Sequence, residues 1–128
     1  MPKKLGIKEG HRVALVEAPQ GIGELLGALP EAKLQAGLAG QEPLDVVLLF
    51  VTRRKDLERL LPRVRTRMAP AAGFWVAWPK KASGVATDMT DHVVREVALP
   101  TGLVDNKVCA IDETWTGLRL VLRVALRG

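Results

Sequence analysis

The sequence has 128 residues, 48% of them hydrophobic, which predicts a single domain over residues 1–128 with an apolar core. It has no apolar run near the roughly 20 residues of a membrane-spanning helix and no apolar stretch behind its first lysines, so we expect a cytoplasmic protein with no secretory signal and no membrane partner. One cysteine and two histidines argue against an internal disulfide and a metal site of the usual zinc type, and a net charge of +5 permits an acidic partner.

Short apolar runs bounded by glycine and proline predict the elements of the first half of the chain. Residues 12–16 are β-branched and apolar, as in a strand, and residues 44–51 are apolar at nearly every position, which is typical of a central parallel strand. Between them we expect a turn over residues 19–21, a short helix over residues 22–29 and a weak edge strand over residues 33–38.

A longer helix is predicted over residues 53–68, where leucine and valine recur at helical spacing. Thr52 has a side chain that is favoured at a helix start, so we expect it to cap this helix. Pro62 lies inside the pattern, and a kink or break near residues 58–61 is therefore expected.

The rest of the chain continues the alternation of strands and helices and then ends in two strands. The elements expected there are a strand over residues 74–78, a loop over 80–86, a helix over 89–99 capped by Thr87 or Asp88, and strands over 104–111 and 118–126 that pair across a turn at Thr116 and Gly117.

This order of elements predicts the fold class. Strands that alternate with helices favour a parallel sheet with right-handed crossovers, and two closing strands favour an antiparallel hairpin at one side. We therefore expect an α/β domain with a mostly parallel, Rossmann-like sheet and a C-terminal antiparallel hairpin. The layout is similar, by analogy of fold, to a trimmed methyltransferase-like domain.

Three stretches carry a family resemblance. Residues 5–15 read L-G-I-K-E-G-H-R-V-A-L, residues 78–84 read W-P-K-K-A-S-G, and residues 105–115 read D-N-K-V-C-A-I-D-E-T-W. Together they resemble a family of small bacterial proteins that form a domain of unknown function. The resemblance implies a Rossmann-like, methyltransferase-like fold, and it implies no activity.

The segment E-A-P-Q-G-I-G over residues 17–23 follows the first predicted strand, where dinucleotide and methyl-donor sites carry a glycine-rich turn. Gln20 and Gly21 are the candidate ligand-binding residues of this turn. Pro19 replaces one expected glycine, and no acidic residue ends the second predicted strand. A tight turn without a ligand is the alternative, so no cofactor is expected.

The loop W-P-K-K-A-S-G contains the candidate anion-binding residues Lys80, Lys81, Ser83 and Gly84. It follows a predicted parallel strand, and ligands of open parallel sheets bind at the carboxyl ends of strands. Two ammonium groups, a hydroxyl and loop amides suit a phosphate or a carboxylate. The alternative is a solvated surface loop.

Asp112, Glu113 and Trp115 are expected at the tip of the predicted hairpin, beside Lys80 and Lys81. The two carboxylates suit either a structural ion-pair network with the lysines or an acid/base role. Trp115 is expected either to close one side of an anion pocket or to fold back onto the core.

Four basic residues recur every fourth position along the predicted helix 53–68, namely Lys55, Arg59, Arg63 and Arg67. Such a stripe could follow a nucleic-acid backbone, and an ordinary solvated helix face is the alternative. The chain has no tyrosine and two phenylalanines, which argues against stacking of single-stranded bases.

No catalytic set can be named. Cys109 lies inside an apolar predicted strand, and His11 and His92 have no nucleophile or carboxylate at catalytic spacing. We therefore expect a non-catalytic domain that binds a small anionic ligand or an acidic protein segment where the turn with Gln20 and Gly21, Thr52, and the loop and tip described above converge. The alternatives are a reduced methyltransferase-like enzyme and nucleic-acid binding through the basic helix.

Overall fold

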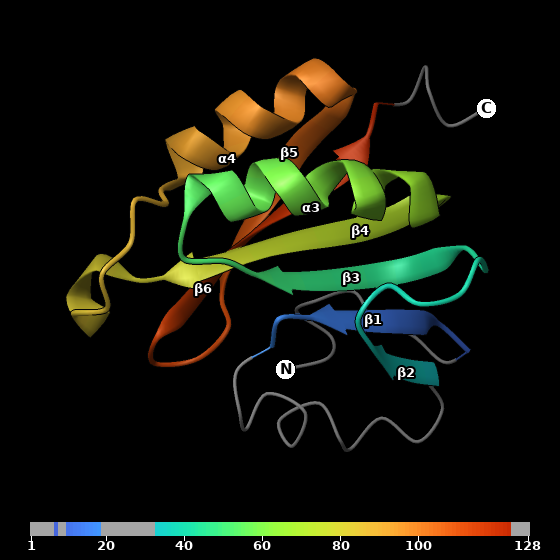
Figure 1. The fold of residues 1–128 in the computed structure, drawn as a ribbon, viewed down its shortest axis with the longest axis horizontal. Helices are drawn as coiled ribbons and strands as arrows, with labels where there is room; N and C mark the ends of the chain where they lie inside the picture. Colours follow the sequence, from blue (N-terminus) through green and yellow to red (C-terminus); the bar gives the residue numbers. More distant parts are fainter. Residues whose placement is uncertain (1–6, 8–9, 19–32, 124–128) are drawn as a thin grey trace.

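The computed structural model describes residues 7, 10–18 and 33–123, and the predicted turn and helix over residues 19–29 lie outside these residues. Six strands of the described chain form one sheet in the order β2-β1-β3-β4-β6-β5 (Figure 1). The pairs among β1 to β4 are parallel, and β6 is antiparallel to both β4 and β5, which confirms the predicted fold class. The elements are β1 (Arg12–Val16), β2 (Lys33–Ala36), β3 (Leu44–Phe50), helix α3 (Arg54–Arg67), β4 (Met68–Pro79), the 3-10 helix η1 (Lys81–Ser83), helix α4 (Asp91–Ala98), the 3-10 helix η2 (Leu99–Thr101), β5 (Leu103–Ala110) and β6 (Trp115–Leu122).

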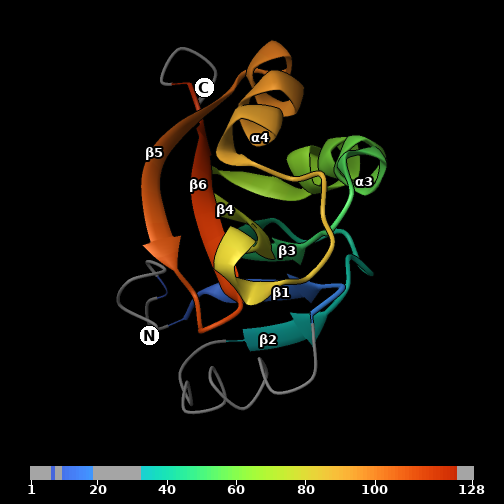
Figure 2. The same ribbon diagram turned by 90° about the vertical axis from the view of Figure 1, so that its left-hand side faces the viewer.

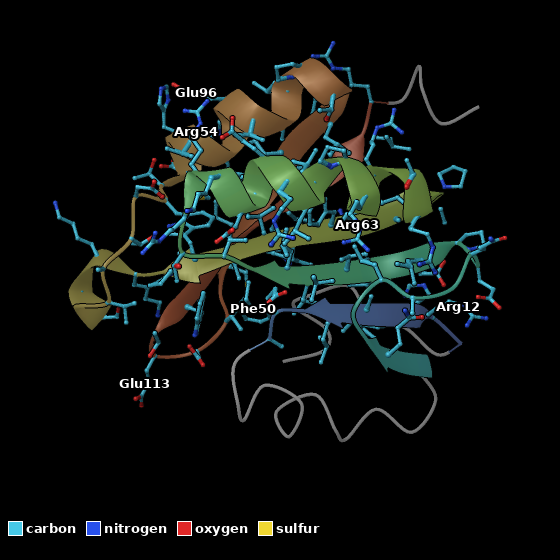
Figure 3. All side chains as sticks on the ribbon, in the orientation of Figure 1. Arg12, Phe50, Arg54, Arg63, Glu96 and Glu113 are labelled. Carbon is cyan, nitrogen blue, oxygen red and sulfur yellow. The ribbon has the colours of Figure 1, made fainter. Side chains whose placement is uncertain are left out.

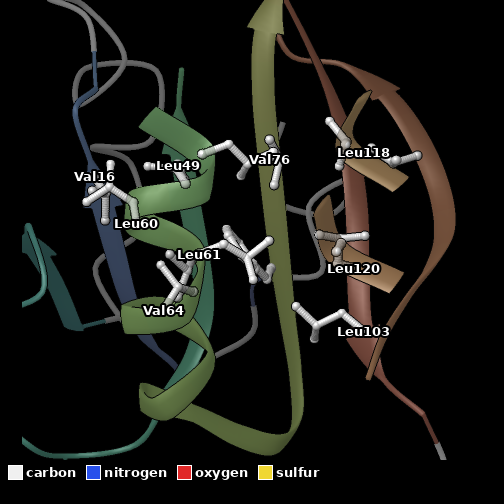
Figure 4. Packing of buried hydrophobic residues seen from close by; sticks show 14 of the residues in the cluster. Val16, Leu49, Leu60, Leu61, Val64, Val76, Leu103, Leu118 and Leu120 are labelled. Atoms are coloured by element: carbon white, nitrogen blue, oxygen red, sulfur yellow. The ribbon is translucent and has the colours of Figure 1, made fainter. Parts of the chain in front are cut away.

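Strand β3 lies inside the sheet between β1 and β4, as its apolar run predicts. Six of its seven side chains are buried, because both of its faces are covered. Helices α3 and α4 lie on one face of the sheet (Figures 1 and 2). Figure 4 shows leucine and valine side chains of α3 packed against those of the strands, and this cluster is the main core of the domain. A second cluster on the opposite face surrounds Trp75.

Helix α3 differs from its prediction in two ways. Its N-cap position is Arg53, which makes no side-chain cap, so the predicted cap at Thr52 is wrong. The Asp88 carboxylate accepts a hydrogen bond from the first helical amide, that of Arg54, at 2.8 Å. The predicted break near Pro62 is also absent, because α3 continues unbroken to Arg67, with Leu61 and Val64 buried on either side of the proline. None of the helices described is long and apolar enough to cross a membrane.

Helix α4 is capped by Thr90, whose hydroxyl accepts a hydrogen bond from the amide of Val93 at 3.1 Å, and not by Thr87 or Asp88. Those two residues instead fasten the preceding loop to the start of α3. The Thr87 hydroxyl donates to the carbonyl of Thr52 at 2.6 Å, and the Asp88 amide donates to the same carbonyl at 3.3 Å.

The turn between β5 and β6 also lies elsewhere than predicted. Gly117 belongs to β6, where a Cβ atom on it would lie 3.0 Å from Ile111 and 3.1 Å from Trp75. The glycine is therefore needed for close packing and not for a turn. The actual turn is closed by Asp112, whose Oδ1 accepts from the amides of Thr114 and Trp115 at 2.8 and 2.7 Å.

We expect Asp88→Ala to lower the free energy of unfolding by about 1 kcal/mol, because the first amide of α3, that of Arg54, loses its carboxylate acceptor. Urea unfolding followed by circular dichroism measures the change. Glu113→Ala is the matched control, because Glu113 is an exposed carboxylate on a turn and caps no helix. Equal stability of the two variants would contradict the capping role of Asp88.

Candidate functional site

The parallel strands β1, β3 and β4 end at the same edge of the sheet. Glu17 follows β1, Val51 follows β3 and Lys80 follows β4. Phe50 lies at this carboxyl edge and Arg12 at the opposite edge (Figure 3). From β1 the chain continues to β2 on one side, and from β3 it continues to β4 on the other. The point between β1 and β3 is therefore the topological switch point, where open α/β sheets bind their ligands.

A cavity of about 230 Å³ lies at this switch point, and we call it the switch-point cavity. Its aromatic wall is a pair of rings, Phe50 and Trp115, whose centroids are 5.2 Å apart with an interplanar angle of 83°. Phe50 is 3% exposed, so the half-buried ring of Trp115 is the main part of this wall that a ligand could contact. The cavity is lined by the residue after β1, by the end of β3 and the two residues after it, and by α3 and β6, namely Glu17, Phe50, Val51, Thr52, Asp56, Arg59, Leu60 and Trp115.

The polar groups of the switch-point cavity carry both signs of charge. Arg59 Nη2 lies 3.8 Å from Asp56 Oδ1, which is too long for a hydrogen bond, and the Arg59 side chain is 60% exposed. An exposed pair of this kind is worth about 0–1 kcal/mol, so a ligand can take its place. Glu17 has a backbone φ of 56°, in the left-handed region that residues other than glycine rarely adopt. Backbone strain of this type is concentrated at functional sites.

Several solved structures with a similar fold are methyltransferases. A SAM-dependent methyltransferase from Aquifex aeolicus has a TM-score of 0.65 at 14% identity, with 94% of this chain and 87% of that chain covered. A TehB-like SAM-dependent methyltransferase from Corynebacterium glutamicum has a TM-score of 0.61 at 12% identity, covering 92% and 83%. Magnesium protoporphyrin IX methyltransferase from Synechocystis, solved with bound SAH, has a TM-score of 0.60 at 10% identity, covering 90% and 75%.

The chain has a methyltransferase-like Rossmann fold. No family model matches the sequence, and no curated protein matches it either. The fold expected from the three resembling stretches is therefore confirmed, while their assignment to one bacterial family stays a prediction.

The methyltransferase-like domain lacks one feature of a nucleoside cofactor site. Such folds usually end the second strand with a carboxylate that binds the ribose hydroxyls. Here β2 is followed by Gly37 and Leu38, and the next carboxylate along the chain is Glu42. The side chain of Gln35 donates to the carbonyls of Gly37 and Ala39, at 3.0 Å each, and so serves the turn after β2. These residues do not fit the ribose of S-adenosylmethionine.

The residues of the predicted anion loop have two different roles: some hold the loop in place and others line a cavity. The Ser83 hydroxyl donates to the Lys80 carbonyl at 2.6 Å and accepts from the Val85 amide at 3.2 Å, so it closes the turn of its own loop. The Lys80 amide donates to the carbonyl of Thr114 at 2.7 Å, which holds the loop against the hairpin tip. Lys81 and Gly84 line a second cavity of about 580 Å³, which we call the loop cavity.

Trp115 and the lysine loop are neighbours, since Trp115 pairs in register with Pro79, but they line different cavities. Trp115 lines the switch-point cavity and packs against the second core cluster, and the loop cavity does not include it. Trp115 therefore shares neither of these two cavities with Lys80 or Lys81. Among the residues that the structure describes, no ion pair joins either lysine to Asp112 or to Glu113, and the carboxylate of Asp112 closes its own turn.

The predicted basic stripe is shorter than its spacing implies. The Arg67 guanidinium donates to the backbone carbonyls of Leu38, Ala39 and Glu42, so it is engaged with the connection between β2 and β3. The exposed part of the stripe is Lys55, Arg59 and Arg63, of which Figure 3 labels Arg63.

Five residues of the switch-point cavity were not among the predicted site residues: Glu17, Phe50, Val51, Asp56 and Leu60. The sequence contains a signal for two of them. Glu17 directly follows the predicted parallel strand 12–16, and Asp56 lies in the first turn of the helix that follows the predicted strand 44–51. Of the predicted residues, Thr52 lines the cavity, and Gln20 and Gly21 lie outside the described residues.

Proposed function

We propose that this domain binds a small zwitterionic molecule of amino-acid size in the switch-point cavity and catalyses no reaction of its own. The observation that carries the proposal is the position of the cavity between β1 and β3, with an aromatic wall and groups of both charges around it. The anionic group of the ligand is the part that the sequence led us to expect.

The size of the cavity favours a ligand smaller than a nucleoside cofactor. Pockets for drug-sized ligands have volumes of about 300–1,000 Å³, and the switch-point cavity, at about 230 Å³, is below this range. The missing ribose carboxylate after β2 points the same way, because a nucleoside would lose its usual partner there.

The charges of the cavity favour a ligand with one cationic and one anionic group. Arg59 has free hydrogen-bonding capacity toward a carboxylate, because Asp56 contacts it only at 3.8 Å. Glu17 and Asp56 supply two carboxylates for an ammonium group, and they disfavour a ligand that is purely anionic. The rings of Phe50 and Trp115 suit an aromatic side chain.

L-phenylalanine tests the proposal against two analogues that each lack one charge, 3-phenylpropionate and 2-phenylethylamine. Titration calorimetry, with tryptophan fluorescence as a second readout, should show that L-phenylalanine binds several-fold more tightly than either analogue. In Arg59→Ala this advantage over 2-phenylethylamine should disappear, because the carboxylate has lost its partner. Arg63→Ala is the matched control one turn along α3 and should bind like the wild type. Equal affinities for the three probes, or no binding of any, would refute the proposed site.

The fold favours a second candidate function, a reduced methyltransferase-like enzyme. S-adenosylmethionine and S-adenosylhomocysteine in the same titration discriminate the two. We expect dissociation constants weaker than micromolar for both, because the sequence has no carboxylate directly after β2 and has Pro19 in place of one expected glycine after β1. A constant in the micromolar range or tighter would support the enzyme and contradict the non-catalytic proposal.

A further inference from the structure

The loop cavity is larger than the switch-point cavity and lies elsewhere on the molecule, at the end of β4 and under residues 84–91. Its volume, about 580 Å³, is within the range of pockets that hold small organic ligands. Neither the proposed zwitterion site nor the basic stripe accounts for it.

The floor of the loop cavity is apolar. Trp78 and Met89 line it and are 7% and 3% exposed, because both belong to the main core under the helices. Val85, at the rim, is 44% exposed and is one of the few large hydrophobic side chains on the described surface. A hydrocarbon or aromatic group in the cavity would pack on this floor and cover the exposed part of Val85, which is favourable in water.

The charged groups of the lining differ in how far they are already paired. Asp91 accepts a hydrogen bond from Arg95 at 2.9 Å, and this bond is the main reason that the pKa of Asp91 lies below its ordinary value. Arg95 also binds Asp105 at 3.1 Å, so Asp91 belongs to a small ion-pair network. Within the described chain the exposed ammonium group of Lys81 has no ionic partner.

Hydrogen bonds hold the walls of the loop cavity in place. Thr87 is bound to the carbonyl of Thr52, and its hydroxyl accepts from the Met89 amide at 3.0 Å. Ser83, which does not line the cavity itself, closes the turn before the lining residue Gly84, whose φ of 77° suits glycine. A cavity with fixed walls loses little conformational entropy when a ligand enters.

We infer that the loop cavity is a second binding site, for an amphipathic monoanion: an apolar body over Trp78 and Met89, with a single carboxylate at Lys81. The site does not depend on the zwitterion site. Arg59→Ala should leave binding in the loop cavity unchanged, so failure of one proposal is distinguishable from failure of the other.

Two probe pairs test the inference, one aliphatic and one aromatic. Each pair compares an anion with a neutral molecule of similar shape: octanoate with 1-octanol, and 2-naphthoate with 2-naphthol. The anion of at least one pair should bind the wild-type protein about fivefold more tightly than its neutral partner, as expected for an ion pair at a partly exposed site. Amide chemical-shift changes should be concentrated at residues 84–91.

Lys81→Met should remove the preference for the anion and leave the affinity of the neutral probe within about twofold, since a single exposed ion pair is lost. Lys80→Met is the matched control, because Lys80 is the neighbouring lysine and does not line the cavity. Val85→Glu, which adds a negative charge at the rim, should lower the affinity for the anion more than the affinity for the neutral probe. The inference is overturned if anion and neutral probe bind equally, if Lys81→Met keeps the preference, or if none of the four probes shifts residues 84–91.

Discussion

Trp75→Ala is expected to lower the free energy of unfolding by about 3–5 kcal/mol, the largest stability effect of any single substitution proposed for this domain. Trp75 lies in β4 and is 0% exposed. It pairs in register with Leu48 of β3 and Arg119 of β6, and it belongs to the second core cluster. Alanine would leave a cavity in a sheet whose neighbouring strands cannot close it, because their own pairing fixes their spacing.

Chemical denaturation followed by far-ultraviolet circular dichroism measures this loss. Val108→Ala is the control, because Val108 is a large hydrophobic residue of the same sheet but is 61% exposed. Its effect should be below about 0.5 kcal/mol. A loss for Trp75→Ala below about 1 kcal/mol would mean that the second cluster is not a packed core.

Arg67→Ala is expected to lower the free energy of unfolding by about 2–3 kcal/mol, because the carbonyls of Leu38, Ala39 and Glu42 lose their charged donor together. These contacts fasten the end of α3 to the connection between β2 and β3. Arg67→Lys should recover only part of the loss, since one ammonium group cannot reproduce the planar set of donors.

Hydrogen exchange supplies a readout that is specific to this contact. The amides of residues 37–42 should exchange faster in Arg67→Ala, while those of α4 should not change. Arg63→Ala is the control on the same helix, because Arg63 is exposed. If Arg67→Ala and Arg63→Ala are equally stable, Arg67 is an ordinary surface residue and the basic stripe regains its fourth member.

The fold could be predicted because its signals are local. The run that becomes β3 is apolar on both faces, and this pattern is sufficient to place it inside a parallel sheet. The errors arise where distant residues decide. The acceptor at the start of α3 comes from Asp88, 34 residues away from Arg54, and a preference for capping residues next to the helix cannot find it. Local signals predict a turn at Gly117, whereas the close contact that requires a glycine there includes Trp75, which is distant in the sequence.

The candidate site residues that the structure describes lie near the carboxyl edge of the sheet, but the cavity-lining ones among them line two cavities instead of one. Trp115 starts β6 and contacts the second cluster, on one face of the sheet, whereas Trp78 belongs to the main cluster under the helices. Alternation along a strand decides this, since a shift of one residue moves a side chain to the other face. A turn at Thr116 and Gly117 would put Trp115 in a loop, where side chains do not alternate between the two faces of a sheet.

The position of β6 has a consequence for the order in which the molecule can be completed during synthesis. β6 is the last of the described strands in the chain, and yet it lies between β4 and β5. Until residue 122 has left the ribosome, the edge of β4 that pairs with β6 has no partner strand. For the same reason, β5 is not yet joined to the sheet, because β6 is the strand that links it to β4. An unpaired edge of this kind is prone to pair with other chains. A nascent chain stalled before β6 should therefore be a substrate for chaperones, and release of the final strand should end that dependence.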